Sequence, residues 1–177
     1  MDQKECLRKS NEILNKTGTE ELRRFAAYQP VTEDLLNTVL EILNSNTHYN
    51  ILENGNPLRT IDEARNEFLN QNTESYLIYL ENKYIGIIDF MKNNPNDNCP
   101  WIGLLMIHGK YHSKGYGRLV YNQFEEKLKQ RGFNKGRIGI LTENTAAKKF
   151  WTSLGFKFYA NKQWRGKAIE CFEKQLI

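Results

Sequence analysis

Glycines and cationic side chains gather in one short segment of the chain, directly after its most apolar run. The run, residues 101–107, reads WIGLLMI, and the segment after it, residues 108–118, reads HGKYHSKGYGR. Apolar residues then recur at helical spacing, so the segment is expected to lead from a buried strand into a helix. Backbone N–H groups at a helix start bind phosphate, and Gly115 and Gly117 have no Cβ to keep a ligand away. Lys114 and Arg118 add positive charge, so the sequence predicts a phosphate site here.

The segment differs from two common nucleotide-binding motifs. It lacks the Gly-Lys-Ser/Thr of a P-loop, and it lacks the third glycine and the βαβ setting of a dinucleotide-binding fingerprint. Taken alone, the pattern also fits a strand–helix turn that binds nothing. The local residues leave these two interpretations open.

A second segment, residues 143–156, reads ENTAAKKFWTSLGF. Together the two segments resemble the GNAT family of acyl-CoA-dependent N-acetyltransferases. The first is similar to that family's acetyl-CoA motif, Arg/Gln-x-x-Gly-x-Gly/Ala, between a central strand and a helix. The second is similar to its Asn…Ala…Phe-Tyr/Trp…Leu-Gly-Phe segment. Their order and spacing agree, and the resemblance covers the chain from about Glu20 to the C-terminus.

The resemblance implies a fold and an activity. The fold would be of the α/β class, an α+β-like mixed sheet, central and mostly antiparallel, flanked by helices. The activity would be transfer of an acetyl group from acetyl-CoA to a primary amine by direct attack on the thioester. The acceptor stays unidentified: a small amine, an antibiotic, a protein N-terminus or a lysine would all serve. A homodimer is a further expectation from the resemblance.

The resemblance also implies which residues bind acetyl-CoA. The pyrophosphate would lie on the amides of the phosphate motif, which comprises His112, Ser113, Lys114, Gly115, Tyr116, Gly117 and Arg118. The backbone of Leu105, Met106 and Ile107 would bind the pantetheine arm, with one amide polarising the thioester carbonyl. Asn144 would contact the pantetheine, while Phe150 and Trp151 would line the thiol end.

Two residues depart from the family pattern. His112 stands where members usually have Arg or Gln, and Trp151 stands where many have a tyrosine that protonates the leaving thiolate. Indole is no acid at neutral pH, so Tyr111, Tyr116, Tyr159 or a water would have to supply that proton. Both departures favour an alternative, a catalytically degenerate domain that binds acyl-CoA as a sensor or scaffold.

The general base is open as well. Members often carry a glutamate on the central strand, but residues 101–107 contain no carboxylate. Asp89, on the preceding strand, is the nearest candidate, with a solvated or capping role as the alternative. His108 titrates in a suitable range, although a histidine at a strand end also serves structure alone. The catalytic candidates are therefore Asp89, His108 and Tyr159.

Other elements would position these residues. Apolar spacing predicts helices after Thr32 and after Thr60, each with carboxylates in its first turn. Residues 76–80 and 84–91 are typical of an antiparallel hairpin, and residues 101–107 of a strand buried on both faces. The remaining expected elements are a strand at 21–28, a helix at 117–130, a strand at 137–141, a helix at 143–154, and strands at 157–159 and 168–175. We expect an N-terminal helical extension at 1–19 and one GNAT-like domain at 20–177.

Composition narrows the function classes. The 177 residues carry 25 Lys and Arg against 21 Asp and Glu, a net charge of +4. A nucleic-acid module using residues 110–137 is a third idea, and the near-balanced charge speaks against it. Three scattered cysteines and three histidines lack metal-ligand spacing, so we expect no metal and reduced thiols. With no bilayer-length apolar run and no apolar N-terminal stretch, we expect a cytoplasmic protein without membrane contact.

Overall fold

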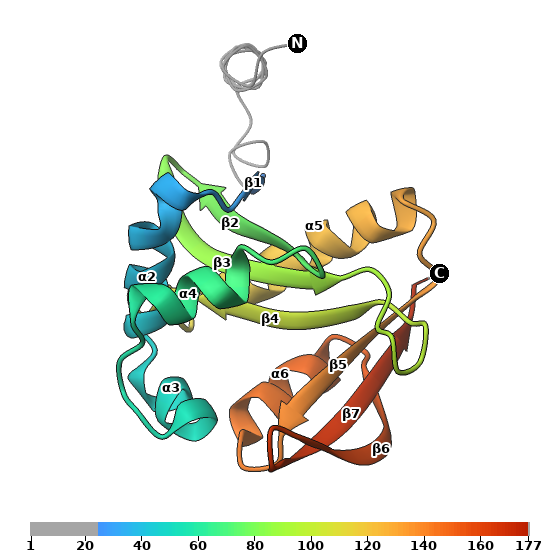
Figure 1. Cartoon of the computed structure of the whole chain (residues 1–177). Coiled ribbons are helices and arrows are strands. Elements are labelled where there is room, and N and C mark those ends of the chain that lie inside the picture. Colours follow the sequence, from blue (N-terminus) through green and yellow to red (C-terminus); the bar gives the residue numbers. More distant parts are fainter. Residues whose placement is uncertain (1–24, 177) are drawn as a thin grey trace, which may run out of the picture.

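The computed structural model describes residues 25–176, which form a single twisted sheet with helices on both faces (Figure 1). Its seven strands are β1 (Ala27–Pro30), β2 (Glu74–Leu80), β3 (Lys83–Met91), β4 (Trp101–Ile107), β5 (Lys135–Leu141), β6 (Lys157–Trp164) and β7 (Lys167–Gln175). They lie in the order β1-β2-β3-β4-β5-β7-β6, and β4–β5 is the one parallel pair among them. The mixed, mostly antiparallel sheet expected from the sequence is confirmed. The expected extension at 1–19 lies outside the described residues, as does the first half of the strand expected at 21–28, whose end overlaps β1.

Helices cover the two faces of the sheet separately. They are the short 3-10 turns η2 (Glu33–Leu35) and η3 (Gly109–Tyr111) and the α-helices α2 (Leu36–Asn44), α3 (Thr47–Asn54), α4 (Ile61–Phe68), α5 (Tyr116–Gln130) and α6 (Thr145–Ser153). One apolar core joins α2 and α4 to residues such as Leu77, Ile87 and Leu104, and the other lies under α5 and α6. Within residues 25–176, no helix is both long and apolar enough to cross a bilayer.

Several local signals act as the sequence predicts. Thr60 caps α4 in a full capping box with Glu63, which satisfies two backbone donors at the helix start. Glu81 and Asn82 both have positive φ, 50° and 63°, the backbone twist that a two-residue hairpin turn requires. The hairpin of β2 and β3 therefore has a fixed register.

The helix α3 was not expected, because its sequence THYNILEN shows little apolar periodicity. Buried polar contacts hold it instead. The Asn50 side chain donates to the carbonyl of Leu43 at 2.9 Å and accepts from Arg59 Nε at 3.0 Å. The Arg59 side chain is 2% exposed and pairs with both Glu53 and Glu67. Buried ion pairs of this kind leave no periodic signal in a sequence.

Strand β4 differs from the expected strand in one respect. Leu104 and Met106 are buried on the α2 and α4 side, and Ile102 on the α5 and α6 side, as predicted. Gly103 is exposed, however, and Leu105 is only half-buried. The reason is that β5 leaves β4 part-way along its length, so one flank of the strand has no neighbour.

Candidate active site

A gap opens between β4 and β5 soon after they begin. Trp101 pairs with Arg137 and Ile102 with Ile138, and within residues 25–176 no later pair joins the two strands. Both strands nevertheless continue beyond these pairs. Their facing backbone edges therefore lack a strand partner, and an extended ligand arm could form hydrogen bonds to them.

The turn from β4 into α5 leaves consecutive backbone amides free. Ser113 and Gly115 have positive φ, 61° and 80°, and Gly115 precedes α5 without a side-chain cap. In the described part of the chain, the amides of residues 113–118 have no hydrogen-bond acceptor. Free amides at the positive end of a helix dipole form an anion site. The geometry thus suits the phosphate group that the sequence predicts here.

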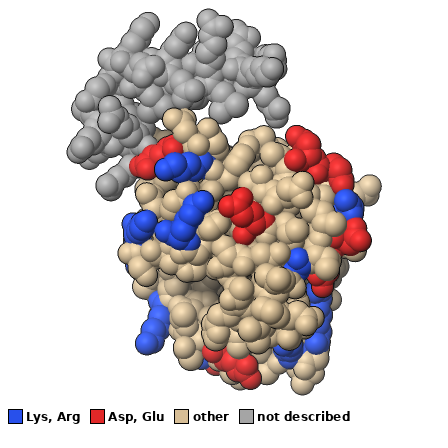
Figure 2. Space-filling view, turned by 90° about the vertical axis from the view of Figure 1, so that its left-hand side faces the viewer, with Lys and Arg blue, Asp and Glu red and all other residues tan. Residues whose placement is uncertain are grey.

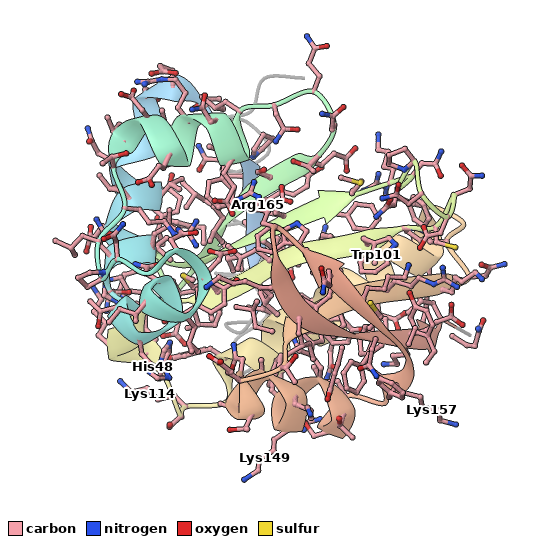
Figure 3. All side chains as sticks on the ribbon, turned by 60° about the horizontal axis from the view of Figure 1, so that its bottom comes forward. His48, Trp101, Lys114, Lys149, Lys157 and Arg165 are labelled. Carbon is pink, nitrogen blue, oxygen red and sulfur yellow. The ribbon has the colours of Figure 1, made fainter. Side chains whose placement is uncertain are left out.

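The cations near this turn play different parts. The Lys114 ammonium is exposed and lies 5.8 Å from the Tyr111 ring. Figure 3 shows Lys114 and Lys149 pointing outward at the periphery of the molecule. Arg118, in contrast, donates to Ser153 Oγ at 2.8 Å and so ties the start of α5 to the end of α6. Lys114 is therefore the cation that is free to meet a phosphate, whereas Arg118 fixes the two helices.

His112 closes the turn onto the strand. Its Nε2 donates to the carbonyl of Ile107 at 2.7 Å, and Asn46 Nδ2 donates to the same carbonyl at 3.2 Å. The side chain that replaces the Arg or Gln of the family pattern thus holds the free amides against the end of β4. Since the amides come from the backbone, they stay exposed at this turn with a histidine at position 112.

Phe150 and Trp151 occupy different environments although they are adjacent on α6. A Cβ on Gly117 would lie 3.2 Å from the Phe150 ring, so the absent side chain of Gly117 lets Phe150 pack against the start of α5. The Trp151 side chain is 7% exposed and packs edge-on against Tyr121 and Phe156. Phe150 therefore borders the α5 turn, whereas Trp151 belongs to the core beneath it.

The other cofactor-binding candidates are distributed along the gap. Leu105 and Ile107 face the α5 and α6 side and are half-buried, whereas Met106 is buried on the opposite face. Asn144 accepts from the amide of Ala147 at 3.0 Å and thereby caps α6. The backbone of β4 is thus available along the gap. The side-chain oxygen of Asn144, in contrast, already accepts a hydrogen bond.

Asp89 lies beside the middle of β4. It is opposite Leu104 on the neighbouring strand, and its side chain accepts a hydrogen bond from Ser75 Oγ at 2.6 Å. The residue is 8% exposed, and burial raises the pKa of its carboxyl above the usual range. Hydrogen bonds from Ser75 and Thr73 act in the opposite direction. A raised pKa makes the carboxylate a stronger proton acceptor.

The three catalytic candidates do not meet. His108 follows β4, with its Nε2 3.5 Å from Glu41, and burial followed by the Lys110 charge lowers its pKa. It is four residues beyond the position opposite Asp89, roughly 13 Å along an extended strand. Tyr159 lies over the Arg137 guanidinium at 4.7 Å, beside the paired start of β4 and β5, and burial raises its pKa to about 12. The structure thus separates His108, Asp89 and Tyr159 along the gap.

Residues 36–156 match the Acetyltransferase (GNAT) family, and this match spans more than half of the chain. The chain belongs to the GNAT family. An acetyltransferase from Thermus thermophilus has a similar structure, with a TM-score of 0.73 and 19% identity over 85% of this chain and 96% of that one. A Vibrio cholerae spermidine N-acetyltransferase gives 0.63 and 14%, covering 85% and 94%. A ribosomal L7/L12 alpha-N-protein acetyltransferase in complex with coenzyme A gives 0.68 and 13%, covering 85% and 93%. The sequence matches no curated protein.

Three residues of the candidate site were missed in the sequence. Ser75 and Thr73 donate to Asp89, and Asn46 holds the end of β4. The polar Asp89 within an otherwise apolar strand was a visible signal, because a buried carboxylate needs hydrogen-bond donors nearby. Which donors it has depends on the register of β2 against β3, where Ser75 pairs with Asp89.

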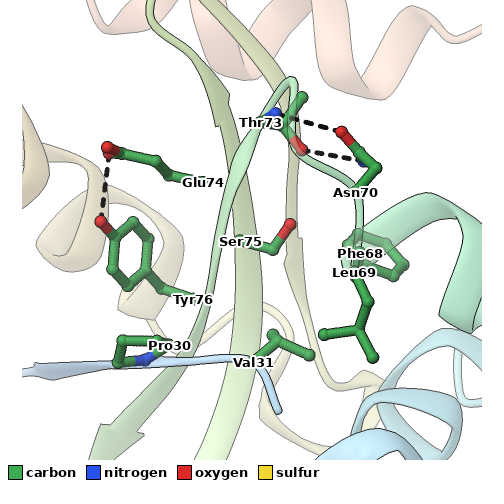
Figure 4. Close-up of a pocket in the computed structure, with 9 residues that line it drawn as sticks. All are labelled: Pro30, Val31, Phe68, Leu69, Asn70, Thr73, Glu74, Ser75 and Tyr76. Carbon is green, nitrogen blue, oxygen red and sulfur yellow. Dashed lines mark hydrogen bonds between the residues drawn. The ribbon is translucent and has the colours of Figure 1, made fainter. Parts of the chain in front are cut away.

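A shallow pocket of about 360 Å³ lies on the β2 side of Asp89, between the end of α4 and the start of β2 (Figure 4). Its wall includes Ser75, which donates to Asp89, and Asn70, which donates to Thr73 Oγ1 at 3.1 Å. It contains none of the predicted site residues. Among residues 25–176, no group of three or more His, Cys, Asp and Glu could hold a metal ion.

Proposed function

We propose that this GNAT domain transfers an acetyl group from acetyl-CoA to a primary amine. The observation that supports this most strongly is the juxtaposition of two binding features. The free amides of residues 113–118 suit the pyrophosphate, and the gap between β4 and β5 begins on the strand that leads into them. A pantetheine arm bound along β4 would then place the thioester near the middle of that strand, within the gap.

Asp89 is our proposed general base. The acceptor enters as an ammonium ion and gives one proton to the Asp89 carboxylate. The neutral nitrogen then attacks the thioester carbonyl, so that a C–N bond forms and the C–S bond breaks. The sulfur keeps the electron pair of the C–S bond and takes the second amine proton, so CoA departs as its thiol. A β4 amide would stabilise the oxyanion formed on the way, and the site acts mainly by positioning the two reactants.

The proton that reaches the thiolate has several possible donors. Trp151 cannot supply it, since its ring is buried in the core and indole is no acid at neutral pH. Tyr111 and Tyr116 lie at the turn into α5, with ring centroids 6.0 Å apart. Both are nearer to the proposed phosphate-binding turn than Tyr159 is. A water molecule is the remaining candidate for the proton donor.

The same observation on Trp151 favours a second function, an acyl-CoA sensor without catalysis. The two functions share the cofactor site and differ in turnover. Calorimetric titration with acetyl-CoA, dephospho-CoA and desulfo-CoA tests the shared part, and we expect micromolar binding that weakens without the 3′-phosphate. No binding would overturn both functions.

A panel of amines then separates the two functions. Butylamine, phenethylamine, spermidine, a lysine peptide and a peptide with a free N-terminus cover the main acceptor chemistries, and thiol release reports acetyl transfer. Transfer to any of them supports the enzyme. Tight acetyl-CoA binding with no transfer to any member favours the sensor.

A further inference from the structure

Two glycines face one another where β4 and β5 part. Ile102 and Ile138 form the last pair, so Gly103 and Gly139 are the next residues on the two strands. Both glycines are exposed, although their neighbours along each strand are buried. The backbone is therefore bare of side chains at the point where the gap opens.

The missing side chains would point to the face that carries α2 and α4. A Cβ on Gly103 would lie 2.6 Å from Asp89 Oδ2. A Cβ on Gly139 would lie 3.1 Å from Ile169 Cδ1 and 3.5 Å from the Trp101 ring. Ile138 faces the opposite core, under α5 and α6, and side chains alternate along a strand, so Gly139 is directed away from that core. At Gly103 a β-bulge interrupts the alternation, and the approach of Asp89 gives the direction instead. The bare backbone is thus open on the face opposite the α5 helix.

Asp89 is aimed at this bare backbone. The residue is 8% exposed, and among residues 25–176 it has no cationic partner in an ion pair. Its Oδ1 accepts from Ser75, so that Oδ2 is the oxygen directed at Gly103. A buried carboxylate without a cation is costly. An ammonium group from outside the chain would reduce that cost.

We infer that Gly103 and Gly139 form the port through which the acceptor reaches the thioester, with its ammonium held by Asp89. The inference rests on the proposed function and adds to it the direction of approach and two specificity-determining residues. Adjacent strands lie about 4.8 Å apart, so a nitrogen above Gly103 is within reach of both Asp89 and the gap. The absence of a side chain at Gly103 is what lets the Asp89 carboxylate reach this edge of β4.

The walls of the port indicate the chemical class of the acceptor. The Trp101 ring borders Gly139 and offers an apolar surface to an alkyl or aryl chain. The Lys162 ammonium lies 5.5 Å from that ring, and Figure 3 shows Arg165 at the tip of the β6–β7 hairpin, above the sheet. These cations disfavour a second positive charge on the acceptor. The port therefore suits a primary amine on an uncharged chain rather than a polyamine.

Gly103→Ala tests the port. The φ of Gly103 is not in the left-handed region, so alanine adds a methyl group without straining the backbone. The methyl group would displace the Asp89 carboxylate or fill the path of the amine. We expect kcat/KM for butylamine to fall about tenfold or more, as one methyl group can achieve in a fitted site. The Kd for acetyl-CoA should change less than twofold.

Two further variants complete the experiment. Gly136→Ala is the matched control on β5, because its nearest neighbour would be Leu176 at 4.0 Å, and it should acetylate like the wild type. Gly139→Ala narrows the other side of the port and should slow butylamine acetylation with acetyl-CoA binding retained. We also expect the wild type to prefer butylamine and phenethylamine to spermidine.

The outcomes separate the port from the proposed function. An active wild type whose Gly103→Ala variant acetylates butylamine equally well would overturn the port alone. So would a parallel loss of acetyl-CoA binding in that variant, which would assign Gly103 to the cofactor or to the fold. A preference for spermidine would overturn the assigned acceptor class. A wild type that binds acetyl-CoA but acetylates no amine in the panel would overturn the proposed transfer itself.

Discussion

The two sides of the β4–β5 gap are built in different ways. On the α5 and α6 side, the candidate ligand groups are consecutive backbone amides from a single turn, residues 113–118. On the α2 and α4 side, the site is assembled from Asp89 on β3, Gly103 on β4 and Gly139 on β5. One side is local and made of backbone, whereas the other is long-range and depends on single side chains or their absence.

This difference predicts how each side responds to substitution. Backbone amides persist when a side chain changes, so we expect the proposed anion site to tolerate His112 in place of the family's Arg or Gln. The Asp89 carboxylate, in contrast, belongs to a single side chain and is lost when that residue is substituted. Substitutions on the acceptor side should therefore reduce turnover steeply, and substitutions on the cofactor side should weaken acetyl-CoA binding more moderately.

The surface of the acceptor side agrees with this picture. Figure 2, which views the molecule from the side of α2, α3 and α4, shows Lys and Arg in small groups interspersed with Asp and Glu. No single basic area covers this face.

Asp89→Asn should show the largest effect. Asparagine keeps an oxygen that can accept from Ser75, but it cannot take a proton from the acceptor. Loss of a general base costs about 10²- to 10⁴-fold, so kcat/KM for the best amine of the panel should fall at least about 100-fold. Calorimetry should show unchanged acetyl-CoA affinity. Activity within a few-fold of the wild type would remove Asp89 from the mechanism and leave a water as the base.

Gly117→Ala should show the largest effect on the cofactor side. The new Cβ would lie 3.2 Å from the Phe150 ring, so the ring must move from the turn that presents the amides. Overpacking of this kind costs about 1–3 kcal/mol. We expect an acetyl-CoA Kd about tenfold higher in a calorimetric titration, with kcat at saturating acetyl-CoA nearly unchanged. Gly136→Ala again serves as the control. A lower kcat with a wild-type Kd would contradict this expectation, because a substitution on the cofactor side would then reduce turnover instead of acetyl-CoA binding.

Ser75→Ala tests how Asp89 is tuned. The base must be ionised, so activity falls as the pH drops through its pKa, which burial already raises. Removing the Ser75 hydroxyl removes a hydrogen bond that favours the carboxylate, and the pKa should rise further. The acidic limb of the kcat/KM profile should therefore move to higher pH. Thr73 remains as a second donor. The Glu67 carboxyl on α4, whose pKa is raised by burial and then by the Asp89 charge, is unchanged.

Ser75→Thr is the matched control for this shift, because threonine keeps the hydroxyl group. Its acidic limb should coincide with that of the wild type. A uniformly lower rate in Ser75→Ala, with no displacement along the pH axis, would mean that Ser75 supports only the local packing.

The same contrast explains what the sequence could predict. Residues 113–118 and the apolar strand before them are contiguous, so their spacing alone predicted β4 and the turn from β4 into α5. The signals at Thr60, which caps α4, and at Glu81 and Asn82, which form the β2–β3 turn, are likewise local in the sequence. The position of Gly103 beside Asp89 depends on the β3–β4 register and on the bulge between Asp89 and Phe90. Helix α3 depends on the buried side chain of Arg59. Neither relation is visible in a single sequence.

Substitution of His112 should show the smallest effect of the variants on the cofactor side. Its Nε2 shares the Ile107 carbonyl with Asn46, so His112→Ala loosens the turn but leaves that carbonyl one donor. A neutral hydrogen bond contributes about 0.5–1.5 kcal/mol, which predicts an acetyl-CoA Kd about two- to tenfold higher by calorimetry. His112→Gln can donate to the same carbonyl and should bind like the wild type. A weaker Gln variant with a normal Ala variant would show that His112 does not act through this hydrogen bond, and the cofactor side would then depend on side chains as the acceptor side does.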